Sequence, residues 1–217
     1  MPSFWTALFE GTDSVPLLIQ ALEEHPDLTG GDLGDGTHAL SAWLEGWAQR
    51  SHVAYCAELR KVGIRKPGYA TAWSWRSPYY SPESTGNLPE ESMRLVRVCL
   101  ERGMSPLQRL RTMPCDALTL AFCWGVPNLF QALVGSLSPA EVHALSHRRM
   151  NNDVWKDLQW LMWAAQHSSP VFLSSLLEHG ADPQVLTEKG ENALFFAKST
   201  PVAQALLRAG VAFEQPS

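Results

Sequence analysis

Short apolar segments along the chain end in the same way. In four places a Leu or a Cys stands four residues before a glycine, inside a segment whose apolar residues recur at helical spacing. Glycine adopts the left-handed conformation that closes an α-helix without steric cost, so each glycine predicts a helix end. A fifth segment keeps the helical pattern but has Leu137 in place of the glycine. Counted from Gly63, the ends follow at steps of 40, 34, 43 and 30 residues. The four glycine-terminated segments are 59–63, 99–103, 176–180 and 206–210.

A shorter apolar segment precedes most of these helix ends. Segments 117–121 and 161–165 are each followed within a few residues by a Gly or Pro that breaks the chain, and segment 193–197 follows the turn 188–192. Small Ala residues three or four positions apart in these segments allow two helices to approach closely. The pattern therefore predicts helix pairs. Each pair is too small to bury its own apolar face, so neighbouring pairs must stack.

The residues 176–183 (Leu-Leu-Glu-His-Gly-Ala-Asp-Pro), followed by 190–197 (Gly-Glu-Asn-Ala-Leu-Phe-Phe-Ala), resemble the ankyrin repeat. Segment 116–134 is similar to a further copy, and the matches before about residue 94 are looser. The resemblance implies an all-α ankyrin-repeat solenoid of about five to six stacked helix pairs in a single domain, 1–217. Its expected parts are a cap at 4–28 and repeats at about 35–64, 68–106, 115–137, 153–183 and 188–213.

The chain departs from the repeat pattern in three places. Trp43 and Trp75 stand where small residues are expected, so the first helices there are expected to pack differently or to shift register. Residues 76–89 form an insertion. The link between 138 and 153 is also long, and it begins Ser-Pro-Ala-Glu. A Ser cap, a Pro in the first turn and a Glu three residues after the cap predict a short extra helix there.

Composition places the chain among globular proteins. Of its 217 residues 45% are hydrophobic and 18% are charged, which excludes disorder as the dominant state. No stretch approaches the roughly 20 apolar residues that a membrane-spanning helix needs, and the first residues carry no basic cluster ahead of an apolar run. We therefore expect no membrane association and a cytoplasmic location.

Charge is distributed unevenly along the sequence. Residues 1–49 hold eight acidic residues and no Lys or Arg, whereas residues 50–111 hold 11 basic and five acidic ones. In a linear repeat array this polarity would persist at the surface, although a solvated face without a role explains it equally well. The first interpretation predicts that acidic residues, with Asp32, Asp35 and Glu45 as candidates, steer a partner that has a basic surface.

Little in the sequence predicts chemistry. His143 and His147 are spaced to face one metal ion, but the Glu of a zinc-protease motif is missing, so an ordinary helix face is the preferred interpretation. The glycine-rich segment 30–37 lacks the features of a phosphate loop or a calcium loop. The four cysteines show no disulfide or metal spacing, and the short basic clusters do not suggest nucleic-acid binding. We predict no catalytic residue, no metal and no cofactor.

Aromatic and polar residues at predicted helix ends are the candidates for binding a protein. The resemblance places Cys123 with Trp124, and Gln166 with His167, at the groove side that ankyrin repeats use for partners. Tyr79 and Tyr80 lie in the insertion, and exposed Tyr and Trp are frequent interface anchors. Packing in the core or the loop remains the alternative for these aromatics.

The predicted function is to bind one protein partner, without chemistry of its own, by a chain that is monomeric alone. An inhibitor of immunity-protein type is the leading hypothesis. The alternatives are a scaffold or host-directed effector that links two proteins, a self-associating array, and an enzyme whose residues converge without a motif.

Overall fold

The structure, a computed structural model, describes residues 3–28, 33, 37–61, 86–111, 115–148, 159–167 and 170–212, except for the side chains of 52–61. Regular secondary structure in these residues is helical, and an isolated antiparallel bridge joins Arg109 to Asp116. This confirms the predicted all-α class. Among the described helices, none is both long and apolar enough to cross a membrane.

The chain divides into two compact units. The first contains α1 (Phe4–Gly11), α2 (Val15–Glu24), the 3₁₀ turn η1 (Pro26–Leu28), α3 (Ala39–Lys61), α4 (Glu90–Glu101) and α5 (Ala117–Cys123). The second contains α6 (Pro127–Gly135), α7 (Pro139–His147), α8 (Trp160–Gln166), α9 (Pro170–Glu178), the 3₁₀ turn η2 (Ala193–Phe196) and α10 (Thr200–Arg208).

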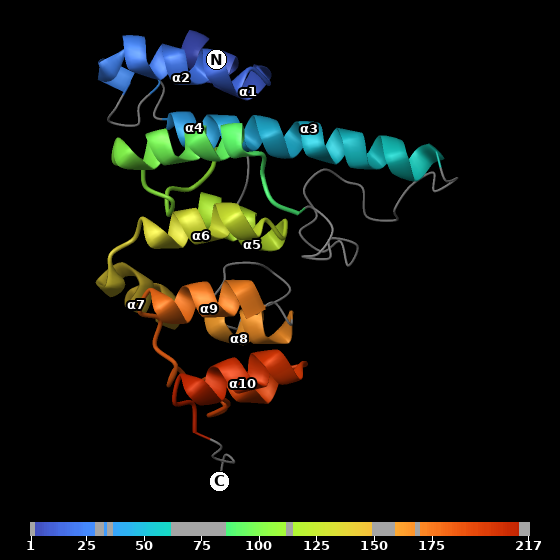
Figure 1. The fold of residues 1–217 in the computed structure, drawn as a ribbon, viewed down its shortest axis with the longest axis vertical. Coiled ribbons are helices and arrows are strands. Elements are labelled where there is room, and N and C mark those ends of the chain that lie inside the picture. The colour runs from blue at the N-terminus through green and yellow to red at the C-terminus, as the bar shows by residue number, and fades with distance from the viewer. Residues whose placement is uncertain are drawn as a thin grey trace. The chain divides into compact units, whose positions relative to one another are not determined.

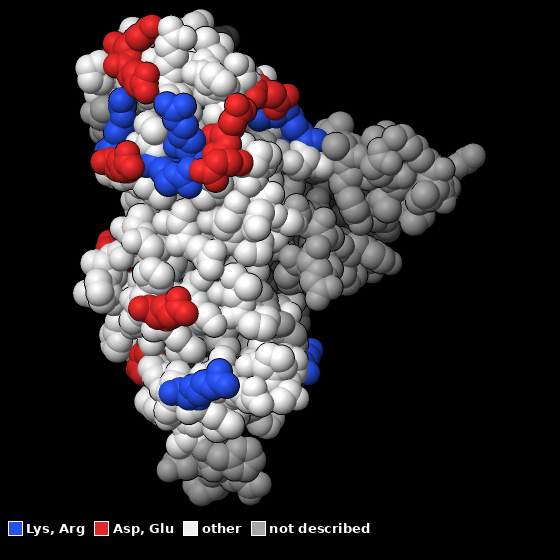
Figure 2. Space-filling view, viewed as in Figure 1, with Lys and Arg blue, Asp and Glu red and all other residues white. Residues whose placement is uncertain are grey.

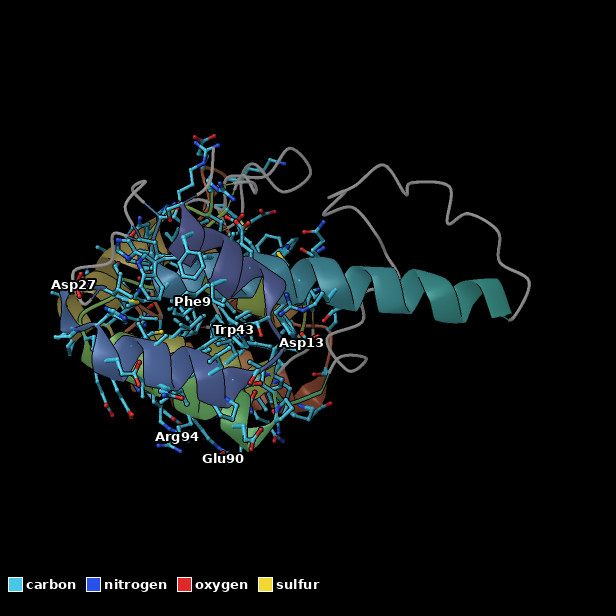
Figure 3. The ribbon with its side chains drawn as sticks, turned by 90° about the horizontal axis from the view of Figure 1, so that it is seen from above. Phe9, Asp13, Asp27, Trp43, Glu90 and Arg94 are labelled. Carbon is cyan, nitrogen blue, oxygen red and sulfur yellow. The ribbon has the colours of Figure 1, made fainter. Side chains whose placement is uncertain are left out.

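In the first unit, one pair of helices lies on another. Helix α1 packs on α3 and α2 packs on α4, as Figure 1 shows with α1 and α2 above α3 and α4. Phe9 and Trp43 are buried between these layers, at 0% and 2% exposure, whereas Asp13 and Asp27 are exposed, and Figure 3 shows Asp27 at the margin. Trp43 stacks on Trp47 with ring centroids 6.5 Å apart. Burial of aromatic area therefore holds α3 in place, where a standard repeat would use small residues.

Residues 39–61 form one uninterrupted helix, so the helix pair predicted within 35–64 is wrong. This segment contains no Pro, and its single glycine, Gly46, lies where α1 passes closely. A Cβ built on Gly46 would stand 2.1 Å from the carbonyl oxygen of Glu10. The glycine thus makes room for a neighbour and does not end the helix. Of the predicted repeat 68–106 the structure describes α4, which, with α3, forms the layer beneath α1 and α2.

The predicted helix ends at Gly103, Gly180 and Gly210 are confirmed. Their φ angles are 81°, 102° and 86°, in the left-handed region. In each case the glycine N–H donates to the carbonyl three residues back, and the next residue's N–H donates to the carbonyl five residues back, as in a Schellman motif. The Leu or Cys four residues before the glycine supplies that second carbonyl, and its buried side chain lies at the position that contacts the residue after the glycine. The pairs of residues are Cys99 with Met104, Leu176 with Ala181, and Leu206 with Val211. Gly63 lies outside the described residues.

The second unit also consists of layered helices. Helix α9 packs against α6, α8 and α10, and α8 packs against η2 (Figure 1). The ring of Phe130 in α6 contacts those of Phe172 and Trp160, with centroids 4.8 and 6.2 Å away. The apolar segment 193–197, predicted as a first helix, forms only the 3₁₀ turn η2. The predicted extra helix is confirmed as α7, whose capping box joins Ser138 and Glu141.

Candidate functional site

Trp124 and Cys123, predicted as partner-facing residues, are not an exposed pair. Trp124 is only 7% exposed, in the turn that follows α5, so the expected exposed anchor is wrong. Cys123 ends α5 with partial exposure, yet its thiol is largely desolvated. Burial, with a smaller contribution from the nearby carboxylate of Asp116, raises the pKa of Cys123 to about 12. Neither side chain offers a reactive or fully accessible contact.

Gln166 and His167, at the end of α8, remain partly accessible. The imidazole of His167 packs edge-to-face on Trp163 of the same helix, with ring centroids 4.9 Å apart. Burial, and secondarily the charge of Lys198, lowers the pKa of His167 below the ordinary histidine value. His167 is therefore neutral at physiological pH.

Of the three acidic residues predicted to steer a partner, the structure describes Glu45, which is not at the surface where steering requires a charge. Glu45 is 4% exposed, and its carboxylate accepts a hydrogen bond from the backbone N–H of Arg111. A buried and bonded carboxylate cannot steer a partner at long range, so this prediction is wrong for Glu45. Asp32 and Asp35 lie outside the described residues, as do Tyr79 and Tyr80.

Other amino-terminal acids are paired with arginines from later in the chain. The guanidinium of Arg50 lies 2.5 Å from the carboxylate of Asp13 and donates to the carbonyl of Glu10. Arg111 pairs with the carboxylate of Glu10. Figure 2 shows the result: red and blue side chains alternate on the visible part of the first unit. The sequence polarity therefore does not persist as an undivided acidic surface, because the fold brings downstream arginines back to α1.

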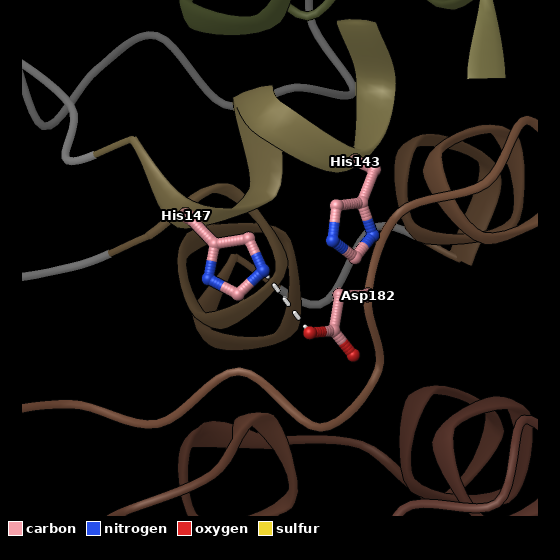
Figure 4. Close-up of side chains that lie close together, drawn as sticks. All are labelled: His143, His147 and Asp182. Carbon is pink, nitrogen blue, oxygen red and sulfur yellow. Dashed lines mark ion pairs between the residues drawn. The ribbon is translucent and has the colours of Figure 1, made fainter. Parts of the chain in front are cut away.

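Three potential metal ligands come together in the second unit, on α7 and on the turn after α9. His143 and His147, one helical turn apart, have ring centroids separated by 5.0 Å. The Nε2 atom of His147 lies 3.1 Å from the carboxylate of Asp182, and one ligand atom from each of the three residues falls within 4.8 Å of the others (Figure 4). Both histidines are exposed, and Asp182 is half-buried. Sequence reasoning considered the two histidines but missed Asp182, although that residue belongs to the quoted Gly-Ala-Asp-Pro turn.

Asp182 is fixed in place by bonds on two sides. Its backbone N–H donates to the hydroxyl of Ser146 at 3.1 Å, and its Oδ1 atom accepts from the N–H of Gln184 at 2.9 Å. Ser146 is fully buried and donates to the carbonyl of His143 at 2.6 Å. The turn after α9 is thus attached to α7 at the level of the two histidines, and the Oδ2 atom of Asp182 is left to face His147.

Large apolar side chains are also exposed on the second unit. Phe195 in η2 is 66% exposed and contacts Phe196 edge-to-face, with centroids 5.3 Å apart. Leu186, in the loop before η2, is 52% exposed. The loop that carries it is held by the Gln159 side-chain amide, which donates to the Leu186 carbonyl at 2.9 Å. These side chains are therefore exposed on a supported backbone.

The described residues form an all-helical structure of layered helices. No protein-family model matches the chain, and no curated protein or solved structure matches it either. The ankyrin resemblance therefore continues to rest on the motif and on the helix ends described above.

Proposed function

We propose that the chain is a non-enzymatic, ankyrin-like module that binds one protein partner. The observation that supports this most directly is the repeated helix end. Three helices close with the same two hydrogen bonds and with a buried pair of residues at the same two positions, as expected for copies of one structural repeat. Stacked repeats make a stiff surface, so little conformational entropy opposes association with a partner.

The exposed apolar residues of the second unit supply the best candidates for the contact. Phe195 and Leu186 lie near each other in the sequence and, as large apolar side chains in water, gain most from being covered. Because Trp124 is buried, Phe195 replaces it as the aromatic anchor in our proposal. Gln166 and His167, which are partly exposed and uncharged, are suited to the polar rim of such an interface.

A rigid module that has no catalytic activity would act by blocking its partner. This is the mode of the leading hypothesis, an inhibitor of immunity-protein type, and it predicts a 1:1 complex in which the partner loses its activity. A scaffold would instead bind a second protein while the first remains bound. Sedimentation and activity measurements on the reconstituted complex distinguish the two modes.

The experiment is affinity capture from native lysate with the wild-type chain and two matched variants. Phe195→Ser removes the proposed anchor, and Leu207→Ser changes an apolar residue of similar exposure, 51%, on α10. Both sites are exposed, so both variants should keep the wild-type circular dichroism spectrum and melting temperature. We expect one protein to be captured by the wild type and by Leu207→Ser but lost with Phe195→Ser. Equal capture by all three chains, or no specific capture at all, would contradict the proposal.

A further inference from the structure

We propose that His143, His147 and Asp182 form a binding site for a divalent transition-metal ion, with Zn²⁺ as the expected occupant. The inference is independent of the proposed protein partner, because it concerns the purified chain alone. It rests on the meeting of two side chains from α7 with one from the turn after α9 (Figure 4).

The spacing of the three ligands is close to what zinc requires. A tetrahedral zinc ion with ligands at about 2.0–2.1 Å holds its ligand atoms about 3.4 Å apart. The Nε2 atom of His147 and the Oδ2 atom of Asp182 are already 3.1 Å apart, and all three ligand atoms lie within 4.8 Å of one another. The largest separation exceeds this spacing by at most about 1.4 Å, a movement of the size that a rotation of the His143 ring can supply. That ring is exposed, so it can rotate without disturbing the core.

The chemistry of the ligands selects the class of ion. Two imidazole nitrogens and one carboxylate oxygen suit Zn²⁺ and its first-row neighbours, whereas Mg²⁺ and Ca²⁺ prefer sites made of oxygen atoms. Three protein ligands leave a coordination position for water or for a side chain from another molecule. Because both histidines are exposed, that position is accessible from solvent.

The surrounding structure holds the ligands as a metal site requires. The capping box fixes the start of α7, and the bond from the Asp182 N–H to Ser146 fixes the turn against the same helix. The bond from the Gln184 N–H to Oδ1 orients the carboxylate, which is the role of the outer hydrogen bonds around known metal ligands. Arg148 follows the site and repels a cation, but it is exposed, so solvent and salt screen much of that repulsion.

The test is zinc binding by isothermal titration calorimetry, with the full chain and three variants. His143→Ala removes one ligand and leaves the contact of His147 with Asp182 intact. Asp182→Asn keeps the shape of the side chain and the acceptor for Gln184 but removes the charge. His25→Ala is the control, since its ring contacts Trp5 in the first unit, 4.7 Å between centroids. Cobalt substitution gives a second readout, because a visible band without thiolate charge transfer reports nitrogen and oxygen ligands and excludes a cysteine site.

We expect the wild type and His25→Ala to bind one zinc ion saturably, and we expect both His143→Ala and Asp182→Asn to raise Kd by about tenfold or more. Circular dichroism should show that all four chains are folded. If the wild type binds no zinc saturably at micromolar concentrations, or if His143→Ala and Asp182→Asn bind as tightly as the wild type, the proposal is overturned. His147 and Asp182 would then serve only to hold α7 against the turn after α9.

Discussion

Replacing Gly46 with Ala sets two physical effects against each other. Within a helix, Ala is favoured over Gly by about 1 kcal/mol, so helix propensity alone predicts that Gly46→Ala stabilises α3. The structure predicts the opposite. The new methyl group would lie 2.1 Å from the Glu10 carbonyl oxygen and 2.7 Å from its carbon, both of which are backbone atoms that cannot rotate away.

The cost has two sources in the packing of α1 on α3. Forcing an extra methyl group into a packed contact costs about 1–3 kcal/mol. Moving the Glu10 carbonyl also disturbs the hydrogen bond that it accepts from the guanidinium of Arg50, and bonds to a charged donor are each worth about 1.5–3 kcal/mol. After subtraction of the propensity gain, the expected loss is about 1.5–5 kcal/mol in the free energy of unfolding. For a chain of this size that corresponds to a fall in Tm of about 3–20 °C.

The assay is urea and thermal unfolding followed by circular dichroism, with Gly11→Ala as the matched control. Gly11 is the last residue of α1, and a Cβ there would meet nothing within 4 Å. Gly11→Ala should therefore be neutral or slightly stabilising. If Gly46→Ala proved as stable as Gly11→Ala, the close approach of α1 to α3 would be refuted, and with it the layered arrangement of the first unit.

Three further predictions concern the second unit and the cysteines. Gly210→Ala should cost about 1–2 kcal/mol of unfolding free energy, because the backbone at this position is left-handed. Gly180→Ala should cost more, because its Cβ would also meet Pro139 at 3.3 Å. Equal losses in the two variants would argue against the contact with Pro139. Because the pKa of His167 is lowered in the folded state, the unfolded chain binds the proton more tightly, and stability should fall as pH drops below about 6.5. Subtracting the urea-unfolding profile of His167→Gln isolates this contribution, and parallel profiles would exclude it. Cys123, with its pKa near 12, should react with iodoacetamide far more slowly in the native chain than in urea, and similar rates would show that the thiol is accessible.

The features that could be predicted from the sequence are those encoded by neighbouring residues. The order Ser138, Pro139, Glu141 predicted the start of α7 because a capping box is complete within four residues. The helix ends at Gly103, Gly180 and Gly210 were predictable for the same reason, since a Schellman motif spans only six residues.

The features that could not be predicted depend on contacts between distant segments. From the sequence alone Gly46 is only a residue of low helix propensity, and its role becomes clear once α1 is known to pass close to it. Glu45 reads as a surface acid, but its hydrogen-bond donor is the N–H of Arg111, 66 residues away. Asp182 joins the two histidines only because Ser146 holds the turn after α9, a contact that spans 36 residues. No local pattern reports such pairings, so neither the burial of Glu45 nor the place of Asp182 among the candidate metal ligands could be predicted from the sequence.

The pairing of Glu10 with Arg111 has a consequence for synthesis of the chain. The two residues are 101 positions apart, so at ribosomal rates of roughly 5–20 residues per second the arginine is made about 5–20 s after the glutamate. For most of that interval the apolar side of α2, including Leu22, lacks the later helix α4, and α1 lacks the arginine that pairs with Glu10. The amino-terminal segment of the nascent chain therefore exposes apolar surface, of the kind that molecular chaperones bind on the ribosome.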